Sequence, residues 1–91
     1  MGKASRSKPR YLAAKLLQVR QSLDLSQNEM LEKLGLKETH FRSNISAFER
    51  GVREPSYIIL LLYAKAAGVC TDILIDDELK LPKKLPGDKR H

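Results

Sequence analysis

The segment that decides the fold spans residues 26–51 and reads SQNEMLEKLGLKETHFRSNISAFERG. Ser26 can cap a helix, because its hydroxyl can accept a hydrogen bond from a free backbone N–H of the first turn, and Glu29 three residues later completes a capping box. Gly35 stands where the chain can leave a helix through positive φ. The first half of the segment therefore predicts a short helix over residues 27–34.

The second half of the segment predicts another helix, which ends just before Gly51. Phe41, Ile45 and Phe48 are spaced i, i+4 and i+7, so they would share one inward face. This spacing favours a start near Thr39, whose hydroxyl could cap the helix. Two short helices with a glycine-containing connection are typical of a helix-turn-helix unit, in which the second helix can enter the DNA major groove.

The composition limits what else the chain could do. Its 91 residues make one small domain, and its single cysteine allows neither an intrachain disulfide nor a cysteine-based zinc site. Two histidines leave little material for a catalytic or metal site, so we expect no enzyme, no cofactor and no metal. No apolar run approaches the roughly 20 residues of a membrane helix, and we expect no membrane partner.

The net charge of +6 is concentrated near the two ends of the chain. Residues 1–20 carry six basic side chains and no acidic one, and residues 80–91 carry five basic side chains and one acidic. Residues 21–79 are mildly acidic, with six basic and ten acidic side chains. Basic arms of this kind suit a phosphate backbone or an anionic lipid, with simple solubility as the alternative.

The chain divides into three parts on these patterns. Residues 1–7 read as a flexible basic arm, residues 8–75 as the helix-turn-helix domain, and residues 76–91 as an extended basic tail in which leucine alternates with lysine and proline. The domain should contain five short helices and no strand, an all-α bundle. Besides the two above, the expected helices run from Lys8 or Pro9 to Leu23, from a Ser56 cap to Ala67 before Gly68, and over roughly Thr71 to Ile75.

Residues 16–75 resemble the lambda-repressor-like, Cro/CI-type (XRE family) helix-turn-helix domain of prokaryotic and phage regulators. The resemblance is carried by Leu-Ser-Gln at 25–27, Ile-Ser-x-x-Glu-x-Gly at 45–51 and Pro-Ser at 55–56, a combination that is specific in this order. It implies a five-helix bundle that binds double-stranded DNA.

The chain departs from the family pattern in two places. Ile45 stands ten positions after Gly35 where the family usually has six, and four residues are about one helical turn. They could lengthen the second helix of the unit or form a separate turn before it. Leu31 also replaces the small alanine usual in the family, which would set the two helices slightly further apart.

The polar face of the second helix lies opposite its apolar positions on a helical wheel. Arginine can bind guanine O6 and N7 together, and serine can bond several base edges. Because the resemblance assigns base reading to this face, we predict that Arg42, Ser43 and Ser46 read bases. Asn44 lies at the edge, where phosphate contact and adenine readout both stay open. The alternative is an ordinary solvated face.

Basic and amide side chains around this helix are candidates for phosphate contacts. Gln27 occupies the family's phosphate-contacting position, at a helix N-terminus whose free N–H groups favour an anion. Basic side chains of the N-terminal arm could follow the backbone or enter a minor groove. The predicted phosphate-contacting residues are Gln27, Asn28, Lys37, Arg50, Arg53, Lys8 and Arg10.

Arg20 and Glu49 flank inward faces, and the family pairs the corresponding residues across two helices. We predict a largely buried structural ion pair that fixes the orientation of the second helix of the unit. A catalytic role for this pair is not expected.

The helix expected over residues 57–67 carries Ile58, Ile59 and Leu62 where the family usually has polar residues. With Tyr57, Leu60, Leu61 and Ala64 assigned to the core, this helix would be apolar all round and would need an outer cover. We predict that Ile58, Ile59 and Leu62 form a homodimer interface. The alternative is that the tail over residues 79–85 folds back over this helix. Cys70 should be a part-buried filler, and Tyr11, Tyr57 and Tyr63 should be packing residues.

These observations predict a cytoplasmic transcription regulator that binds duplex DNA as a homodimer and represses. Two alternatives stay open. One is an antitoxin of a toxin–antitoxin module that binds its toxin through the C-terminal tail, and the other is a protein-interaction module that has lost specific DNA binding.

Overall fold

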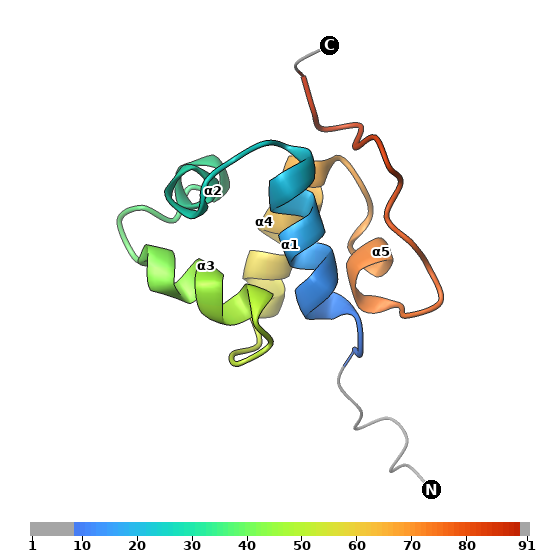
Figure 1. Cartoon of the computed structure of the whole chain (residues 1–91), viewed down its shortest axis with the longest axis horizontal. Helices are drawn as coiled ribbons and strands as arrows, with labels where there is room; N and C mark the ends of the chain where they lie inside the picture. Colours follow the sequence, from blue (N-terminus) through green and yellow to red (C-terminus); the bar gives the residue numbers. More distant parts are fainter. Residues whose placement is uncertain (1–8, 90–91) are drawn as a thin grey trace, which may run out of the picture.

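The structure, a computed structural model, describes residues 9–89, which form five helices and no strand. The helices are α1 (Leu12–Ser22), α2 (Gln27–Leu34), α3 (Arg42–Glu49), α4 (Tyr57–Ala67) and α5 (Thr71–Ile75), as Figure 1 shows. The predicted all-α, five-helix bundle is confirmed. The predicted basic arm over residues 1–7 and Lys8 lie outside the described residues.

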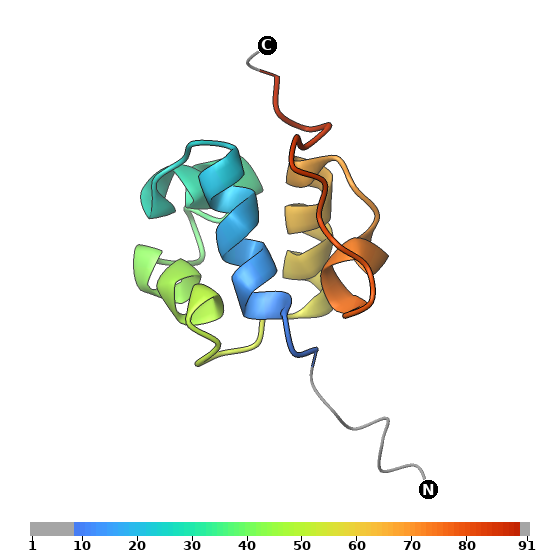
Figure 2. The same cartoon turned by 45° about the vertical axis from the view of Figure 1, so that its right-hand side comes forward.

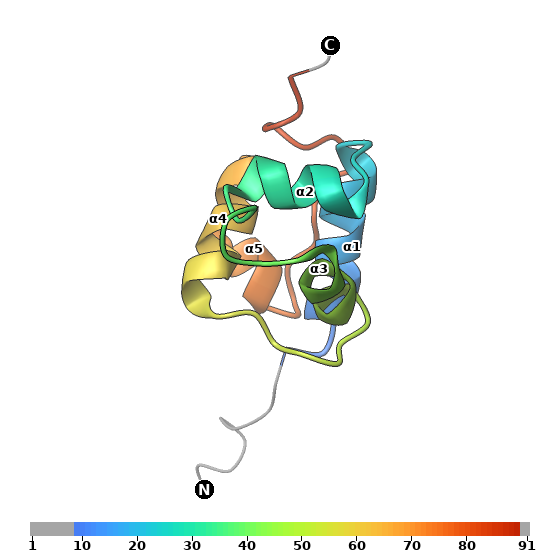
Figure 3. The same ribbon diagram turned by 90° about the vertical axis from the view of Figure 1, so that its left-hand side faces the viewer.

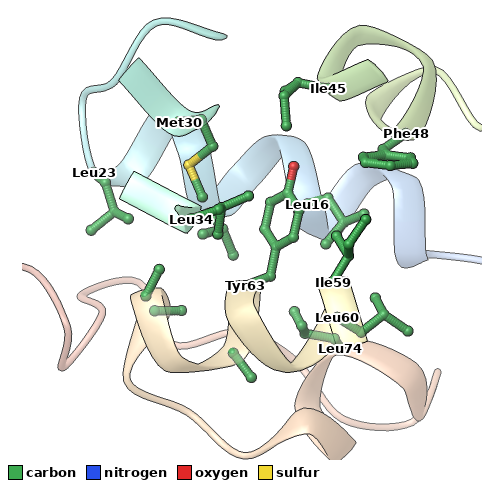
Figure 4. Packing of buried hydrophobic residues seen from close by; sticks show 14 of the residues in the cluster. Leu16, Leu23, Met30, Leu34, Ile45, Phe48, Ile59, Leu60, Tyr63 and Leu74 are labelled. Atoms are coloured by element: carbon green, nitrogen blue, oxygen red, sulfur yellow. The ribbon is translucent and has the colours of Figure 1, made fainter. Parts of the chain in front are cut away.

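Helix α1 runs through the middle of the bundle. Turning the molecule shows α2 and α3 on one side of α1, and α4 and α5 on the other (Figure 2). The core lies where these helices meet, and Figure 4 shows Tyr63 rising from α4 between Leu34, Leu16 and Ile45. Each of these four side chains is at most 4% exposed.

The ends of α2 are set by the predicted residues. Ser26 Oγ accepts a hydrogen bond from Glu29 N at 3.0 Å, and Glu29 Oε1 accepts one from Ser26 N at 2.7 Å. Gly35 follows the helix with a φ of 75°, the left-handed conformation that glycine adopts without strain. The capping box and the closing glycine are therefore confirmed. Helix α4 is also capped as predicted, by Ser56.

Helix α1 begins later than the sequence predicts, at Leu12 rather than at Lys8 or Pro9. The backbone N–H groups of Arg10 and Tyr11 donate instead to the carboxylate of Asp77, at 2.9 and 3.2 Å. Tyr11 is the N-cap residue of α1, so the carboxylate lies at the N-terminus of the helix, where a negative charge is favourable. The start of α1 is thus marked by a residue from the far end of the chain.

The start predicted for α3 is wrong, because the four extra residues form a separate turn. Thr39 does not cap the helix: the N–H groups of Thr39 and His40 both donate to Leu36 O, at 3.1 and 2.9 Å. Phe41 follows in an extended conformation and is 74% exposed, whereas the prediction placed it in the core. Leu36, at 8% exposed, is the residue of this turn that enters the core.

Residues 76–89 contain neither helix nor strand, and they pack against the chain's own helices. Leu81 and Leu85 are buried in the common core, at 8% and 2% exposed. Gly87 N donates to Ala67 O at 2.9 Å, at the end of α4. A Cβ added at Gly87 would lie 2.1 Å from Ala66 O, so only glycine permits this approach.

A buried lysine ties α1 to the start of this tail. Lys15 is 6% exposed, and its Nζ donates to the carbonyl oxygens of Ile73, Asp76 and Leu79 at 2.8, 2.9 and 2.8 Å. The three N–H groups of the ammonium are thereby all bonded. Together with the Asp77 carboxylate on the start of α1, Lys15 forms the α1–tail clasp, which is the name used below for these two residues and their partners.

Several predictions about exposed and buried side chains need correction. Ile59, assigned to the dimer interface, is 8% exposed and belongs to the chain's own core, because it lies on the side of α4 that faces the other helices. Tyr57 and Leu61, assigned to the core, are 79% and 42% exposed, because they lie on the opposite side of α4. Tyr11 is not a buried packing residue either, at 48% exposed, whereas Tyr63 is fully buried. Cys70 is exposed rather than part-buried.

None of the helices within residues 9–89 combines the length and the apolar character needed to cross a membrane. The same residues hold no group of three His, Cys, Asp or Glu side chains placed to bind a metal ion.

Candidate nucleic-acid interface

Helix α3 lies at the surface with one side turned inward. Seen from the side of Figure 3, it lies end-on in front of the bundle. Ile45 and Phe48 are 0% and 3% exposed and attach it to the core. Arg42 and Ser43, in its first turn, are exposed, and Ser46 one turn later is half-buried. The predicted base-reading residues thus lie on the outward side of α3.

The orientation of α3 is fixed by a hydrogen-bonded ion pair. Arg20 Nε donates to Glu49 Oε2 at 2.6 Å, and a second Arg20 nitrogen donates to Glu49 Oε1 at 3.0 Å. The side chains are 17% and 5% exposed. The hydrogen bond with Glu49 raises the pKa of Arg20, and burial opposes that rise. Such a two-point contact holds both side chains in one geometry.

The same ion pair also reaches α2. Gln27 Nε2 donates to Glu49 Oε1 at 3.1 Å, and Arg20 donates to the carbonyl of Leu25 at 2.9 Å. The network therefore joins α1, the start of α2 and the end of α3. Gln27, predicted to bind a phosphate, has its side-chain amide engaged in this network. Its phosphate contact stays a prediction that rests on the backbone N–H at the start of α2.

Two further side chains of α3 make local hydrogen bonds. Asn44 Oδ1 accepts from Phe41 N at 2.8 Å, so Asn44 stabilises the first turn of the helix and keeps its amide Nδ2 as the donor for a ligand. Ser46 Oγ accepts from Arg50 Nε at 3.0 Å, which holds Arg50 along the outward side of α3.

The predicted phosphate-contacting residues gather at the two ends of α3. Asn28 and Lys37 line a hollow between α2 and the start of α3, together with Arg42. Arg10 and Arg53 line a second hollow, between the start of α1 and the loop after α3. A helix placed in a DNA groove has one phosphate backbone on each side, so two flanking groups of this kind suit it. Lys8 lies outside the described residues.

The hollow beside α2 also contains Phe41 and His40, which the sequence reasoning did not assign to the interface. The signal that could have found them is the insertion itself. Four residues added next to a recognition helix add side chains at the same surface. The acidic side chains Glu29 and Glu32 line this hollow too, so it is not uniformly positive.

One comparison with known proteins found a match. A family model described as helix-turn-helix matches residues 16–74, which is more than half of the chain and runs from α1 to α5. Neither a search of curated proteins nor a search of solved structures found a match. The match supports a DNA-binding transcription regulator. The chain therefore belongs to the helix-turn-helix family of the Cro/CI (XRE) type.

Proposed function

We propose that the protein is a sequence-specific repressor that binds duplex DNA as a homodimer in the cytoplasm. The observation that carries the proposal is that α3 has one buried side and one exposed polar side. Ile45, Phe48 and Glu49 fix one side to the bundle, and Arg42 and Ser43 lie exposed on the other. A helix held in this way can enter the major groove with the first turn nearest the base edges.

Binding measurements with selected duplexes test this function. Sequences that the purified protein enriches from a random pool are measured by fluorescence anisotropy at several salt concentrations. Arg42→Ala should lose about 1–3 kcal/mol of discrimination at one base pair. Arg53→Ala should weaken binding to all sequences and reduce the salt slope by about one. Lys65→Ala, an exposed charge on α4, is the matched control.

Two outcomes would contradict the proposal. Absence of any duplex affinity at low salt would exclude DNA binding and favour the protein-interaction module. Binding that Arg42→Ala weakens equally for every sequence would remove the base-reading role. A reporter gene distinguishes repression from activation. If it carries the selected site between its promoter elements, its expression should fall when the protein is supplied.

The proposed homodimer uses the apolar face of α4 that the structure leaves exposed, which differs from the predicted one because Ile59 is buried. Tyr57, Ile58 and Leu61 are 79%, 52% and 42% exposed, and their spacing of i, i+1 and i+4 places them on one side of the helix. Leu62 is only partly buried and borders the core. A neighbouring protomer could cover this apolar face and place two α3 helices about 34 Å apart, one turn of duplex.

The oligomeric state can be measured directly by light scattering or sedimentation. Ile58→Lys should convert a dimer into a monomer, because a charge would enter the apolar contact. Val52→Lys, at a loop residue that is 69% exposed, is the control and should stay dimeric. A wild-type protein that is monomeric at high concentration would remove the dimer from the proposal.

The antitoxin alternative receives less support. A toxin that binds the tail through Leu81 or Leu85 would first have to pull these buried residues out of the core.

A further inference from the structure

Phe41 is a large apolar side chain that lies exposed at the surface. It is 74% exposed, whereas Phe48, which the sequence pattern placed on the same face of the helix, is 3% exposed. Exposing a side chain of this size forgoes about 1.5–3 kcal/mol of burial. An aromatic residue in this position is therefore suited to a contact with another molecule.

The position of Phe41 is well defined although its ring is exposed. Its N–H donates to Asn44 Oδ1 at 2.8 Å, and its carbonyl accepts from Asn44 N at 2.8 Å. The preceding turn is closed by the two hydrogen bonds to Leu36 O. The backbone that carries the ring is thus held on both sides, at the residue directly before α3.

The hollow beside Phe41 is rich in charged residues, although it is not uniformly polar. Its other lining residues are the charged Glu29, Glu32, Lys37 and Arg42, together with Asn28, His40 and the apolar Leu31. Protein–protein interfaces have an apolar centre from which charged residues are depleted. A phenylalanine ring among amide and charged groups does not match that pattern. It matches a DNA groove, where polar contacts to base edges and phosphates surround isolated apolar methyl groups.

We propose, on the basis of the DNA-binding function above, that Phe41 contacts the 5-methyl group of a thymine in the major groove. The first residues of a recognition helix are those that reach the base edges. The thymine methyl is the apolar group that a base pair presents in this groove, and phenylalanine is one of the side chains that contact it. Phe41 is then a specificity-determining residue that selects thymine beside the base pair read by Arg42.

The experiment removes the methyl group and the ring separately. In a duplex carrying the selected site, each thymine is replaced in turn by deoxyuridine, which lacks only the 5-methyl group. At one thymine in a half-site, this replacement should weaken wild-type binding about fourfold, the effect of one methyl group. Phe41→Ala should bind the thymine and the deoxyuridine duplexes equally. Ile75→Ala, at an exposed residue of α5 on the other side of α1, should keep the wild-type response.

The outcomes separate this inference from the function on which it rests. If the wild-type protein binds duplex DNA but no deoxyuridine replacement weakens it, the methyl contact is wrong and DNA binding stands. The same holds if Phe41→Ala keeps the full response, or if it changes only the oligomeric state. If the wild-type protein binds no duplex, the proposed function fails and the methyl contact fails with it. Circular dichroism of Phe41→Ala checks that this surface substitution leaves the helices intact.

Discussion

At the scale of single residues, Glu49 has the greatest influence on the candidate interface. Its carboxylate accepts hydrogen bonds from Arg20 on α1 and from Gln27 on α2, while its own backbone belongs to α3. Replacing it leaves the Arg20 guanidinium, whose side chain is only 17% exposed, without its charged partner. Removing one partner of a buried pair is more damaging than replacing both, because the remaining charge stays desolvated.

We therefore predict that Glu49→Ala lowers the free energy of unfolding by about 3 kcal/mol, measured by urea denaturation. Tyr63→Phe is the matched control beside the pair. The Tyr63 hydroxyl is buried and has no hydrogen-bond partner among the described residues, and burial raises its pKa. Removing this hydroxyl should leave the stability unchanged or raise it. Equal losses in the two variants would contradict a special role for the pair.

At the scale of the secondary-structure elements, local signals predicted the helices whose ends are set by local residues. Ser26, Glu29 and Gly35 lie within a few positions of the ends they define, and α2 has the predicted bounds. The start of α1 could not be predicted, because Asp77 is separated from it by 66 positions in the sequence. The start of α3 was misplaced because Phe41 fits the helical spacing of Ile45 and Phe48, and an apolar pattern cannot tell a helix from a turn before it.

The same distinction holds for the candidate site. Ser46 and Glu49 lie within the family motif over residues 45–51, so one partner of the ion pair and one residue of the outward side of α3 could be predicted from it. Phe41 lies in the insertion, for which those motifs give no position. Ile59 was assigned to an interface because a helix rich in apolar residues on every side does not reveal which side faces the core.

The start of α1 should respond to acid through Asp77. Hydrogen bonds from the backbone N–H groups of Arg10 and Tyr11 lower the pKa of this carboxylate, the bond from Arg10 most, and partial desolvation opposes them. A carboxylate whose pKa is lower in the folded state stabilises the protein above its ordinary pKa of 3.8, and that stabilisation is lost as the pH falls below it. Asp77→Asn should therefore flatten the loss of thermal stability between about pH 4 and about pH 2.

Glu78→Gln is the control for this experiment, since it removes a neighbouring exposed carboxylate. It should keep the wild-type dependence on pH. Equal slopes for Asp77→Asn and the wild-type protein would show that Asp77 does not stabilise the start of α1.

At the scale of the whole molecule, residues 76–89 act as part of the folded domain rather than as a free tail. The α1–tail clasp fixes the beginning of the segment, and the contact of Gly87 with the end of α4 fixes its far part. Leu81 and Leu85 lie between these two attachments and are buried. The segment runs beside α4 and α5, on the side of the bundle away from α3 (Figures 1 and 2), so the outward side of α3 stays open.

We predict that Leu85→Ala lowers the free energy of unfolding by about 3 kcal/mol, because it removes a buried side chain and leaves a cavity. Lys84→Ala, at the exposed neighbour, should change the stability by less than about 0.5 kcal/mol. Denaturation in urea measures both. Under conditions in which both variants are folded, they should bind the selected duplex equally, because Leu85 lies away from α3. A Leu85→Ala protein as stable as Lys84→Ala would contradict the packing of the tail, and a selective loss of DNA affinity would show that the tail contributes to the interface.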